Sequence, residues 1–355
     1  MRIAVIAPPW LPVPPASYGG TERVLDTLCR GLVSRGHDVL LYATGDSSCP
    51  VERAWTYREH LGTVAVSPAA ELAHVIDAYD TAAAWGATVI HDHTITGPVW
   101  TGVQGGCPVV TTNHGPFSAD LAAVYRRIGP RVPIIAISHH QASTAGAIPV
   151  HAVIHHGVDL AGVECGTGAG GYAAFLGRMT PEKGVARAIR IARRAGVPLR
   201  IAAKMREPAE HAYFEAAVRP LLDGDVEYLG EVGGEDKDRL LADATCLLNP
   251  IAWPEPFGMV MIEALARGTP VVATPCGAAP EIVEDGVTGI VRDDDDQLAR
   301  AVLTALTLDR AACRAAAETR FSMERMARDH EAVYAGLAAR TRDEVHLADG
   351  RVGTR

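Results

Sequence analysis

Two glutamates, Glu255 and Glu263, stand eight positions apart in an otherwise apolar stretch. Short apolar runs at 246–249 and 270–274 flank them, so the segment between is predicted to be a loop that leads into a helix. At a rise of ~1.5 Å per residue, Glu263 would lie roughly 8 Å along the axis from the helix start. Gly258 allows close approach of a ligand to the backbone, and the free N–H groups of the first turn favour an anion. This layout suits a ligand with hydroxyls at both ends and negative charge between them, such as a nucleotide sugar.

The same two glutamates have a simpler interpretation. A carboxylate near a helix start is favoured by the helix dipole, and the second glutamate would then merely face solvent. The spacing by itself leaves both interpretations open, and the other charged motifs have to decide.

Arg178 and Lys183 form a second charged motif, five positions apart, directly after an apolar run at 173–176. A turn containing Pro181 and Gly184 lies between and beside them, which lets both cations converge on one group. Arginine binds phosphate with two parallel hydrogen bonds, and lysine adds a point charge. A solvated loop is the alternative for an isolated arginine and lysine. As a pair at a strand end, they predict a phosphate site.

Two glycines follow the first apolar run, at 2–7, after a proline-rich loop. Gly19 and Gly20 immediately precede a predicted helix with Thr21 as a plausible N-cap. Such a loop brings a phosphate or a sugar close to a Rossmann-type unit. The Gly-x-Gly-x-x-Gly fingerprint of NAD enzymes is absent, which disfavours a dehydrogenase. Two adjacent glycines alone would equally fit an ordinary turn.

Histidines end two further strands of the first half. His91 and His93 would share one strand face at the carboxyl end of the run at 88–91, where open α/β sheets bind ligands. A metal site would need further ligands that the spacing does not supply, and a buried, hydrogen-bonded histidine is the alternative. His114 follows the next strand and should border the same edge. The pairs at 139–140 and 155–156 are expected to be structural or at the surface.

These motifs together resemble the retaining GT-B glycosyltransferases of family 4, also called glycosyl transferases group 1. The resemblance covers the Glu-x7-Glu motif with Pro-Phe-Gly after its first glutamate, the Gly-Arg…Lys-Gly segment, the Gly-Gly pair and the His-x-His motif. It extends from the first strand to the last helix. It implies transfer of a sugar from a nucleoside diphosphate donor to an acceptor hydroxyl, with retention and without a metal. The mechanism it implies is front-face attack, in which the leaving phosphate takes the acceptor proton.

The resemblance also implies a role for each matching residue. The catalytic set comprises His93, Arg178, Lys183 and Glu255. The donor-binding set comprises Gly19, Gly20, Arg178, Lys183, Glu231, Val232, Glu255, Phe257, Gly258, Met259 and Glu263. Acceptor binding falls to His114 and Tyr18. Within the donor-binding set, Glu255 and the amides near Gly258 would hold sugar hydroxyls, and Glu263 would hold the ribose hydroxyls.

The apolar runs do not alternate with polar residues, which predicts strands buried on both faces of parallel sheets covered by helices. Two successive series of this kind predict an α/β protein with two Rossmann-like domains, the GT-B arrangement, facing each other across a cleft. The expected domains are residues 1–162 for the acceptor and 163–322 for the nucleotide sugar, joined by a flexible glycine-rich linker. A helix at 323–340 is expected to cross back to the first domain, and 341–355 to form a loose tail.

Composition narrows the function classes. The chain has 355 residues and a net charge of −9, which argues against a general nucleic-acid binder and against a strongly electrostatic membrane anchor. Its 7 cysteines lack Cys-x-x-Cys spacing, and no signal sequence or transmembrane run is evident, so a cytoplasmic protein is expected. We expect no cofactor. The expected partners are a UDP-, GDP-, ADP- or dTDP-linked sugar and a small-molecule or saccharide acceptor.

Two acidic segments could suggest a metal. Residues 223–225 have the Asp-x-Asp pattern, but they precede a strand and are predicted to form a turn. Residues 293–296 are four aspartates that are predicted to begin a helix in solvent. The remaining alternatives are a GT-B sugar phosphorylase, a nucleotide-sugar epimerase, and a non-catalytic nucleotide-sugar-binding protein.

Overall fold

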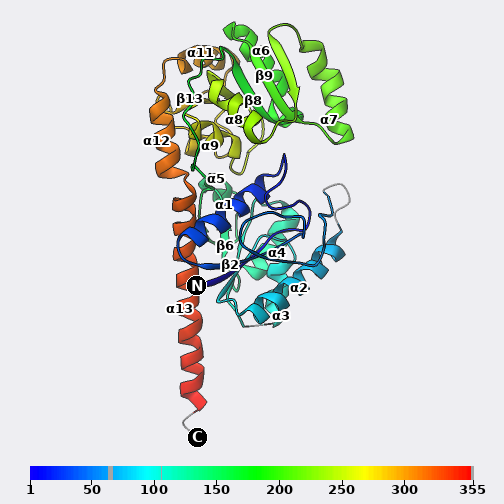
Figure 1. Ribbon diagram of the computed structural model, residues 1–355, viewed down its shortest axis with the longest axis vertical. Coiled ribbons are helices and arrows are strands. Elements are labelled where there is room, and N and C mark those ends of the chain that lie inside the picture. The colour runs from blue at the N-terminus through cyan, green and yellow to red at the C-terminus, as the bar shows by residue number, and fades with distance from the viewer. Residues whose placement is uncertain (63–66, 105, 353–355) are drawn as a thin grey trace. The chain divides into compact units, whose positions relative to one another are not determined.

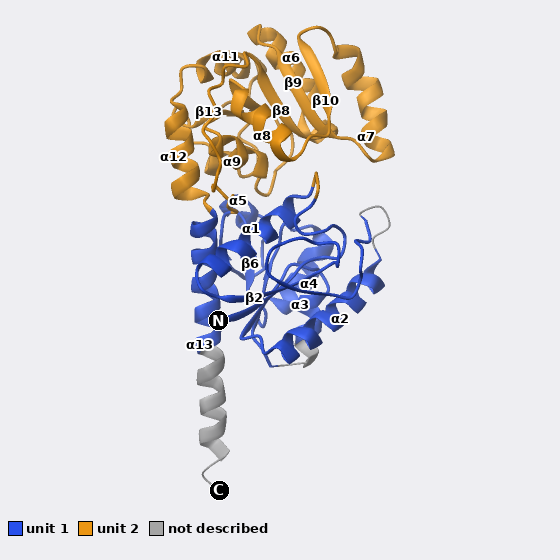
Figure 2. Ribbon diagram, viewed as in Figure 1, with its two compact units in different colours: residues 1–15, 19–155, 323–355 blue, residues 16–18, 156–322 orange. Residues whose placement is uncertain are grey.

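The chain divides into two units of parallel α/β structure. The computed structural model describes residues 1–62, 67–104 and 106–352, with the side chains of 102–104 and 340–352 left out (Figure 1). Unit 1 consists of residues 1–15, 19–155 and 323–355, and unit 2 of residues 16–18 and 156–322 (Figure 2). Two Rossmann-like units were predicted, and this part of the prediction is confirmed.

Unit 1 is built on a seven-stranded sheet in the order β3-β2-β1-β4-β5-β6-β7, with every pair parallel. Its strands are β1 (Arg2–Ile6), β2 (Asp38–Ala43), β3 (Glu52–Trp55), β4 (Val89–Asp92), β5 (Val109–Thr112), β6 (Ile134–Ala136) and β7 (Val150–Val153). Its helices are α1 (Gly20–Ser34), α2 (Pro68–Trp85), α3 (Gly97–Gln104), α4 (Ala119–Ile128), α5 (His139–Ser143) and α13 (Met323–Val352). The strand order reverses between β1 and β4, which makes this the switch point where such sheets bind ligands.

Unit 2 repeats this order with six parallel strands, β10-β9-β8-β11-β12-β13. The strands are β8 (Ala173–Arg178), β9 (Leu199–Lys204), β10 (Val226–Gly230), β11 (Cys246–Asn249), β12 (Val271–Ala273) and β13 (Gly289–Val291). The helices are α6 (Val185–Ala195), α7 (Pro208–Tyr213), α8 (Gly234–Asp243), α9 (Met259–Ala266), α10 (Ala279–Ile282), α11 (Asp295–Ala305) and α12 (Arg310–Arg320), with short turns η1 (Pro181–Lys183), η2 (Phe214–Val218) and η3 (Arg219–Leu221). Its switch point lies between β8 and β11.

The buried strands carry the apolar runs that predicted them, and the strands that the runs did not predict lie at sheet edges. All four residues of β4 are buried, as are all four of β11. The unpredicted strands β3, β7 and β13 are each the last strand at a sheet edge. An edge strand is covered less completely, so it needs no continuous apolar run; β3, Glu-Arg-Ala-Trp, is mostly exposed.

The last helix returns the chain to unit 1, as predicted. In α13, Ala327 and Met323 pack so closely on α1 that a Cβ at Gly31 would lie 2.8 Å from the Ala327 Cβ. The helix runs to Val352, where we had expected a loose tail from residue 341; residues 353–355 lie outside the described part. Among the described residues, no helix combines the length and the apolar character needed to cross a bilayer.

The glycine-rich segment at 162–171 differs from the flexible linker that we expected. Its backbone is hydrogen-bonded to the rest of unit 2. Gly166 N–H donates to Arg267 O at 2.8 Å, and Gly170 N–H donates to Asp243 O at 2.9 Å. The guanidinium of Arg310 also donates to Gly166 O at 2.7 Å. A Cβ at Gly166 would collide with the backbone of Ala242. The glycines therefore serve close packing against unit 2, and the passage between units lies at 155–156.

Candidate functional site

In unit 2, the loops after β8 and β11 are held against each other at the switch point. Ala252 N–H donates to Glu182 O at 2.9 Å. Gly184 has φ +79°, and a Cβ there would collide with the carbonyl of Pro250. The turn that carries Lys183 is thus fixed by backbone contacts to the loop that carries Glu255.

Lys183 and Glu255 form an ion pair in this fixed arrangement. Lys183 Nζ donates to Glu255 Oε2, and the two side chains are only 16% and 17% exposed. The same oxygen accepts a hydrogen bond from Trp253 Nε1 at 2.8 Å, and the Lys183 ammonium lies 5.3 Å from the centre of the Trp253 ring. The structure therefore brings together two residues that were predicted from separate motifs, 72 positions apart in the chain.

The turn after β12 supports the Glu255 loop from the other side. Ala278 N–H donates to Glu255 O at 3.0 Å. Gly277 has φ +63°, and a Cβ there would collide with the Glu255 backbone. The glycine is thus required by both its conformation and this close approach.

Gly258 is the N-cap of α9, with φ 99° and no side chain that could cap the helix. A Cβ at Gly258 would approach the Met261 methyl to 2.6 Å. Phe257 is 2% exposed, and its ring packs edge-on against His156 and Phe321. The Phe257 side chain is thus an anchor of the loop, so a donor contact from this position would be made by the backbone. Met259, half-buried, begins the helix.

Glu263 lies in the second turn of α9 and is paired with α8. Lys237 Nζ donates to Glu263 Oε1 at 2.7 Å, and the side chains are 11% and 14% exposed. Arg267, the C-cap residue of α9, pairs with Asp238 at 2.6 Å. Two adjacent residues of α8 thus pair with one residue of α9 and with its C-cap. Glu263 is largely buried, and the interpretation of Glu263 as a solvent-facing helix residue is wrong.

Arg178 ends β8, directly opposite Lys204 at the end of β9 in the strand register. The Arg178 guanidinium lies 3.5 Å from Glu182 Oε1, and its side chain is 31% exposed. Lys204 is 7% exposed and pairs with Glu210 at 3.4 Å and with Glu207 at 3.2 Å. Three cations, Arg178, Lys183 and Lys204, therefore follow the carboxyl ends of two neighbouring strands.

Glu231 and Val232 follow β10. Glu231 accepts hydrogen bonds from the Arg206 guanidinium at 2.7 and 3.0 Å and from Tyr18 N–H at 3.0 Å. Burial alone would raise the pKa of Glu231, but hydrogen bonds from Ser17, Arg206 and Tyr18 outweigh it and keep the pKa below its ordinary value. Val232 packs in a small apolar cluster of unit 2. Residues 16–18, which include Tyr18, belong to unit 2 with Glu231. The residues before and after them in the chain belong to unit 1.

In unit 1, His93 and His114 meet at the ends of β4 and β5. His93 Nδ1 and His114 Nε2 are hydrogen-bonded at 2.8 Å. The rings of His91 and His93 lie 3.9 Å apart, as their shared strand face predicts. His91 is fully buried and is hydrogen-bonded through both ring nitrogens, to Tyr334 Oη at 2.7 Å and to Thr112 Oγ1 at 2.8 Å. His91 thus has the satisfied, structural role that was the alternative to a metal ligand.

Helix α13 completes this histidine cluster. His330 and Tyr334, four residues apart, both lie against His91, with ring centres 5.2 and 5.6 Å away. Burial lowers the pKa of His330 to about 4 and, together with the neighbouring His330, that of His114 to about 3. Burial also lowers the pKa of His91 well below its ordinary value. These three rings are therefore neutral at pH 7.

Gly19 and Gly20 differ in what surrounds them. A Cβ at Gly19 would lie 2.7 Å from Pro15 Cγ and 2.9 Å from Glu22 Oε2, so this glycine is required by packing. At Gly20, the first residue of α1, a Cβ would meet nothing within 4 Å. Glu22, in the first turn, is 6% exposed, and burial raises its pKa.

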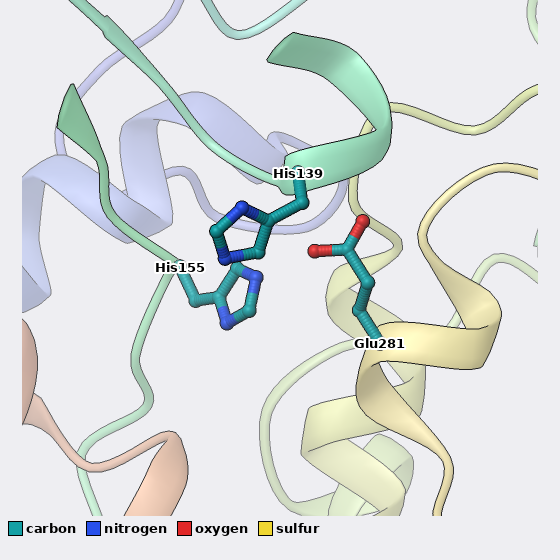
Figure 3. A group of neighbouring side chains, drawn as sticks. All are labelled: His139, His155 and Glu281. Atoms are coloured by element: carbon teal, nitrogen blue, oxygen red, sulfur yellow. The ribbon is translucent and has the colours of Figure 1, made fainter. Parts of the chain in front are cut away.

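Other motifs have structural partners. The rings of His139 and His155 meet edge-on in unit 1 with centres 5.8 Å apart; Figure 3 also draws Glu281, which lies in α10 of unit 2. Asp223 pairs with Arg193, and Asp225 N–H donates to Asp223 at 3.1 Å, so residues 223–225 form the predicted turn. Asp294 caps α11, as predicted for the aspartate run.

Four residues that contact the predicted site residues were not predicted from the sequence. They are Trp253, Lys237, Gly277 and Tyr334. Trp253 could have been suspected from its place two residues before Glu255. Lys237 carries one signal in the sequence, since lysine occurs only at 183, 204 and 237 among 33 lysines and arginines. Tyr334 had no signal beyond its apolar helix face.

Comparisons with known proteins agree between the two halves of the chain. Residues 18–161 match the family described as Glycosyltransferase Family 4, and residues 171–307 match Glycosyl transferases group 1. A D-inositol 3-phosphate glycosyltransferase of Nocardioides sp. is 37% identical over 34% of this chain. The O-antigen chain mannosyltransferase B of Escherichia coli is 32% identical over 36% of it. The chain covers 28% and 34% of the length of these two relatives, respectively.

Solved structures extend the likeness over both units. AviGT4, a glycosyltransferase involved in avilamycin A biosynthesis, superimposes with a TM-score of 0.73 at 27% identity, over 95% of this chain and 98% of its own. Anabaena HepE, solved in complex with UDP and glucose, has a TM-score of 0.73 at 19% identity, over 95% of this chain and 100% of its own. Both share the two-unit fold.

Proposed function

Because the chain belongs to the group 1, family 4 glycosyltransferases of GT-B fold, we propose that it transfers a sugar from a nucleoside diphosphate donor to an acceptor hydroxyl. In this reaction the bond between the anomeric carbon and the diphosphate oxygen breaks, and a bond to the acceptor oxygen forms. The acceptor proton passes to the departing phosphate oxygen. Attack and departure on the same face leave the anomeric configuration unchanged, so the transfer is retaining.

The observation that carries this proposal is the cluster at the switch point of unit 2. Arg178 and Lys183 after β8, Glu255 after β11 and the uncapped N-terminus of α9 combine positive charge with a carboxylate. Preorganised cations and backbone N–H groups stabilise the charge that develops on a leaving diphosphate. We therefore propose that neither a metal nor a cofactor takes part.

The proposed roles follow the family resemblance. Arg178 and Lys183 bind the diphosphate, Glu255 binds hydroxyls of the transferred sugar, and Glu263 binds the ribose. The burial of Glu263 supports this role. A buried carboxylate needs hydrogen-bond partners, and ribose hydroxyls can supply them. On the same proposal unit 1 supplies Gly19, Gly20 and His93. The open space beside Gly20 fits a ligand that approaches the helix start closely.

The donor is best identified with a panel of UDP, GDP, ADP and dTDP and their sugars. A bound ligand raises the melting temperature, with a stabilisation of ~2.7 kcal/mol when its concentration is 100 times Kd. UDP and UDP-glucose are tested first because HepE was solved with UDP and glucose. Slow hydrolysis of the stabilising nucleotide sugar without acceptor is the expected activity. Turnover that requires orthophosphate, or epimerisation of the donor, would replace this proposal with a phosphorylase or an epimerase.

A further inference from the structure

Lysine is used sparingly in this chain, and all three lysines occupy similar surroundings. Among 33 lysines and arginines, lysine occurs only at 183, 204 and 237, all in unit 2. Their side chains are 16%, 7% and 11% exposed, and each one contacts a glutamate. A compact ammonium is strongly hydrated, so burial is costly unless a carboxylate compensates it. Exposed cationic positions are thus left to arginine, and lysine is kept where a compact charge must fit beside a buried carboxylate.

Lys237 has no proposed role so far, although its partner Glu263 is proposed to bind the ribose. It lies in α8 and reaches α9, where its Nζ is 2.7 Å from Glu263 Oε1. In this partly buried position, the hydrogen bond from the ammonium restrains the rotation of the carboxylate. A carboxylate offers about four lone-pair sites, so Glu263 can accept from Lys237 and from ribose hydroxyls together.

We propose that Lys237 is a positioning residue for donor recognition: it holds the Glu263 carboxylate in the orientation that accepts hydrogen bonds from the ribose of the nucleoside diphosphate. This inference rests on the proposed function. Lys237 acts through Glu263 and so governs the preference for ribose over deoxyribose. It leaves the chemistry at the anomeric carbon to the cluster around Lys183 and Glu255.

The second ion pair between the same helices supplies a matched control. Arg267 is 14% exposed and pairs with Asp238 at 2.6 Å, one turn along α9 from Glu263. The Arg267→Met variant removes one ion pair between α8 and the α9 region, as Lys237→Met does, but it leaves Lys237 and Glu263 in place. A purely structural role of the helix contact would make the two variants behave alike.

The test measures binding of UDP, GDP and ADP and of their 2′-deoxy counterparts by calorimetry. A hydrogen bond to a charged group contributes enough that wild type should prefer the ribose form about tenfold or more. We expect Lys237→Met to reduce this preference to about twofold and to raise the donor KM with little change in kcat. Lys237→Arg, which keeps the charge, should restore part of the preference. Arg267→Met should keep the wild-type preference even if its melting temperature falls.

The outcomes separate the two proposals. If Lys237→Met keeps the wild-type preference while Glu263→Gln loses it, the positioning role of Lys237 is overturned and the proposed function stands. If wild type binds both forms equally, or binds dTDP in preference to all three ribonucleotides, the positioning role of Lys237 is overturned together with the ribose role of Glu263, while the proposed sugar transfer stands. If Lys237→Met does not fold, the Lys237→Arg variant decides: an unchanged preference and KM overturn the role. If wild type binds none of the diphosphates, both proposals fail.

Discussion

At the scale of single residues, the predicted donor site consists of charges that compensate one another. Glu255 Oε2 accepts from both Lys183 and Trp253, and Glu263 Oε1 accepts from Lys237. Breaking such a largely buried pair leaves an uncompensated charge, which is costly. A diphosphate at Lys183 would therefore share this cation with Glu255. The loss of Lys183 should therefore affect both binding and chemistry.

Arg178→Ala and Lys183→Ala should each lower donor turnover by ~10² or more, because a preorganised cation on the leaving group contributes on that order. Steady-state kinetics with the donor identified by the panel is the measurement. Arg200→Ala is the control: this β9 arginine is 45% exposed and pairs with Glu227, so turnover should stay near wild type. Turnover within about threefold of wild type in both test variants would refute the phosphate assignment.

At the scale of elements, loops from different strands hold the site residues through backbone contacts. The Glu255 loop is fixed by the turn at Gly277 on one side and by the loop after β8 on the other. In unit 1, α13 brings His330 and Tyr334 to β4. These backbone contacts and buried side chains determine where the predicted site residues lie.

Gly277→Ala should displace the Glu255 loop and lower kcat/KM for the donor by at least about tenfold, since the new Cβ would collide with the Glu255 backbone. Gly286→Ala is the matched control. Gly286 also has a positive φ, +80°, but a Cβ there meets nothing within 4 Å. Both variants carry the backbone strain of a non-glycine residue at positive φ. Equal effects on kcat/KM would show that the loop contact has no role beyond that strain.

His330→Leu should make the free energy of unfolding depend less steeply on pH in acid. Burial lowers the pKa of His330 to about 4, whereas the unfolded value is about 6.5. Between these pH values the unfolded chain binds the extra proton, so stability falls as the pH falls. Removing the group should reduce the slope by up to ~1.4 kcal/mol per pH unit, measured by urea unfolding.

The exposed His151 provides the control, as His151→Leu should keep the wild-type slope. Burial raises the pKa of Asp92 to about 6. This acid therefore has the opposite effect, but it is present in every variant and cancels from the comparison. A His330→Leu slope equal to that of wild type would contradict the buried, neutral state of His330.

At the scale of the whole molecule, the chain passes between the units at 15–16, 18–19, 155–156 and 322–323. Each unit has the strand order that places ligands at a switch point, β1 and β4 in unit 1 and β8 and β11 in unit 2. The proposed site residues belong to both units.

The sequence by itself determined the fold class and the main motifs. Strands buried on both faces need continuous apolar runs, and those runs are visible in the chain. Likewise, the glycine at 258 is visible in the sequence, and the positive φ of 99° at the start of α9 favours glycine there. The edge strand β3, which is mostly exposed, left no such pattern. Tertiary structure alone decided which residues meet across long separations, as Lys237 with Glu263 and Tyr334 with His91. An ion pair or a hydrogen bond depends on positions in space, and no local pattern in the chain records the partner.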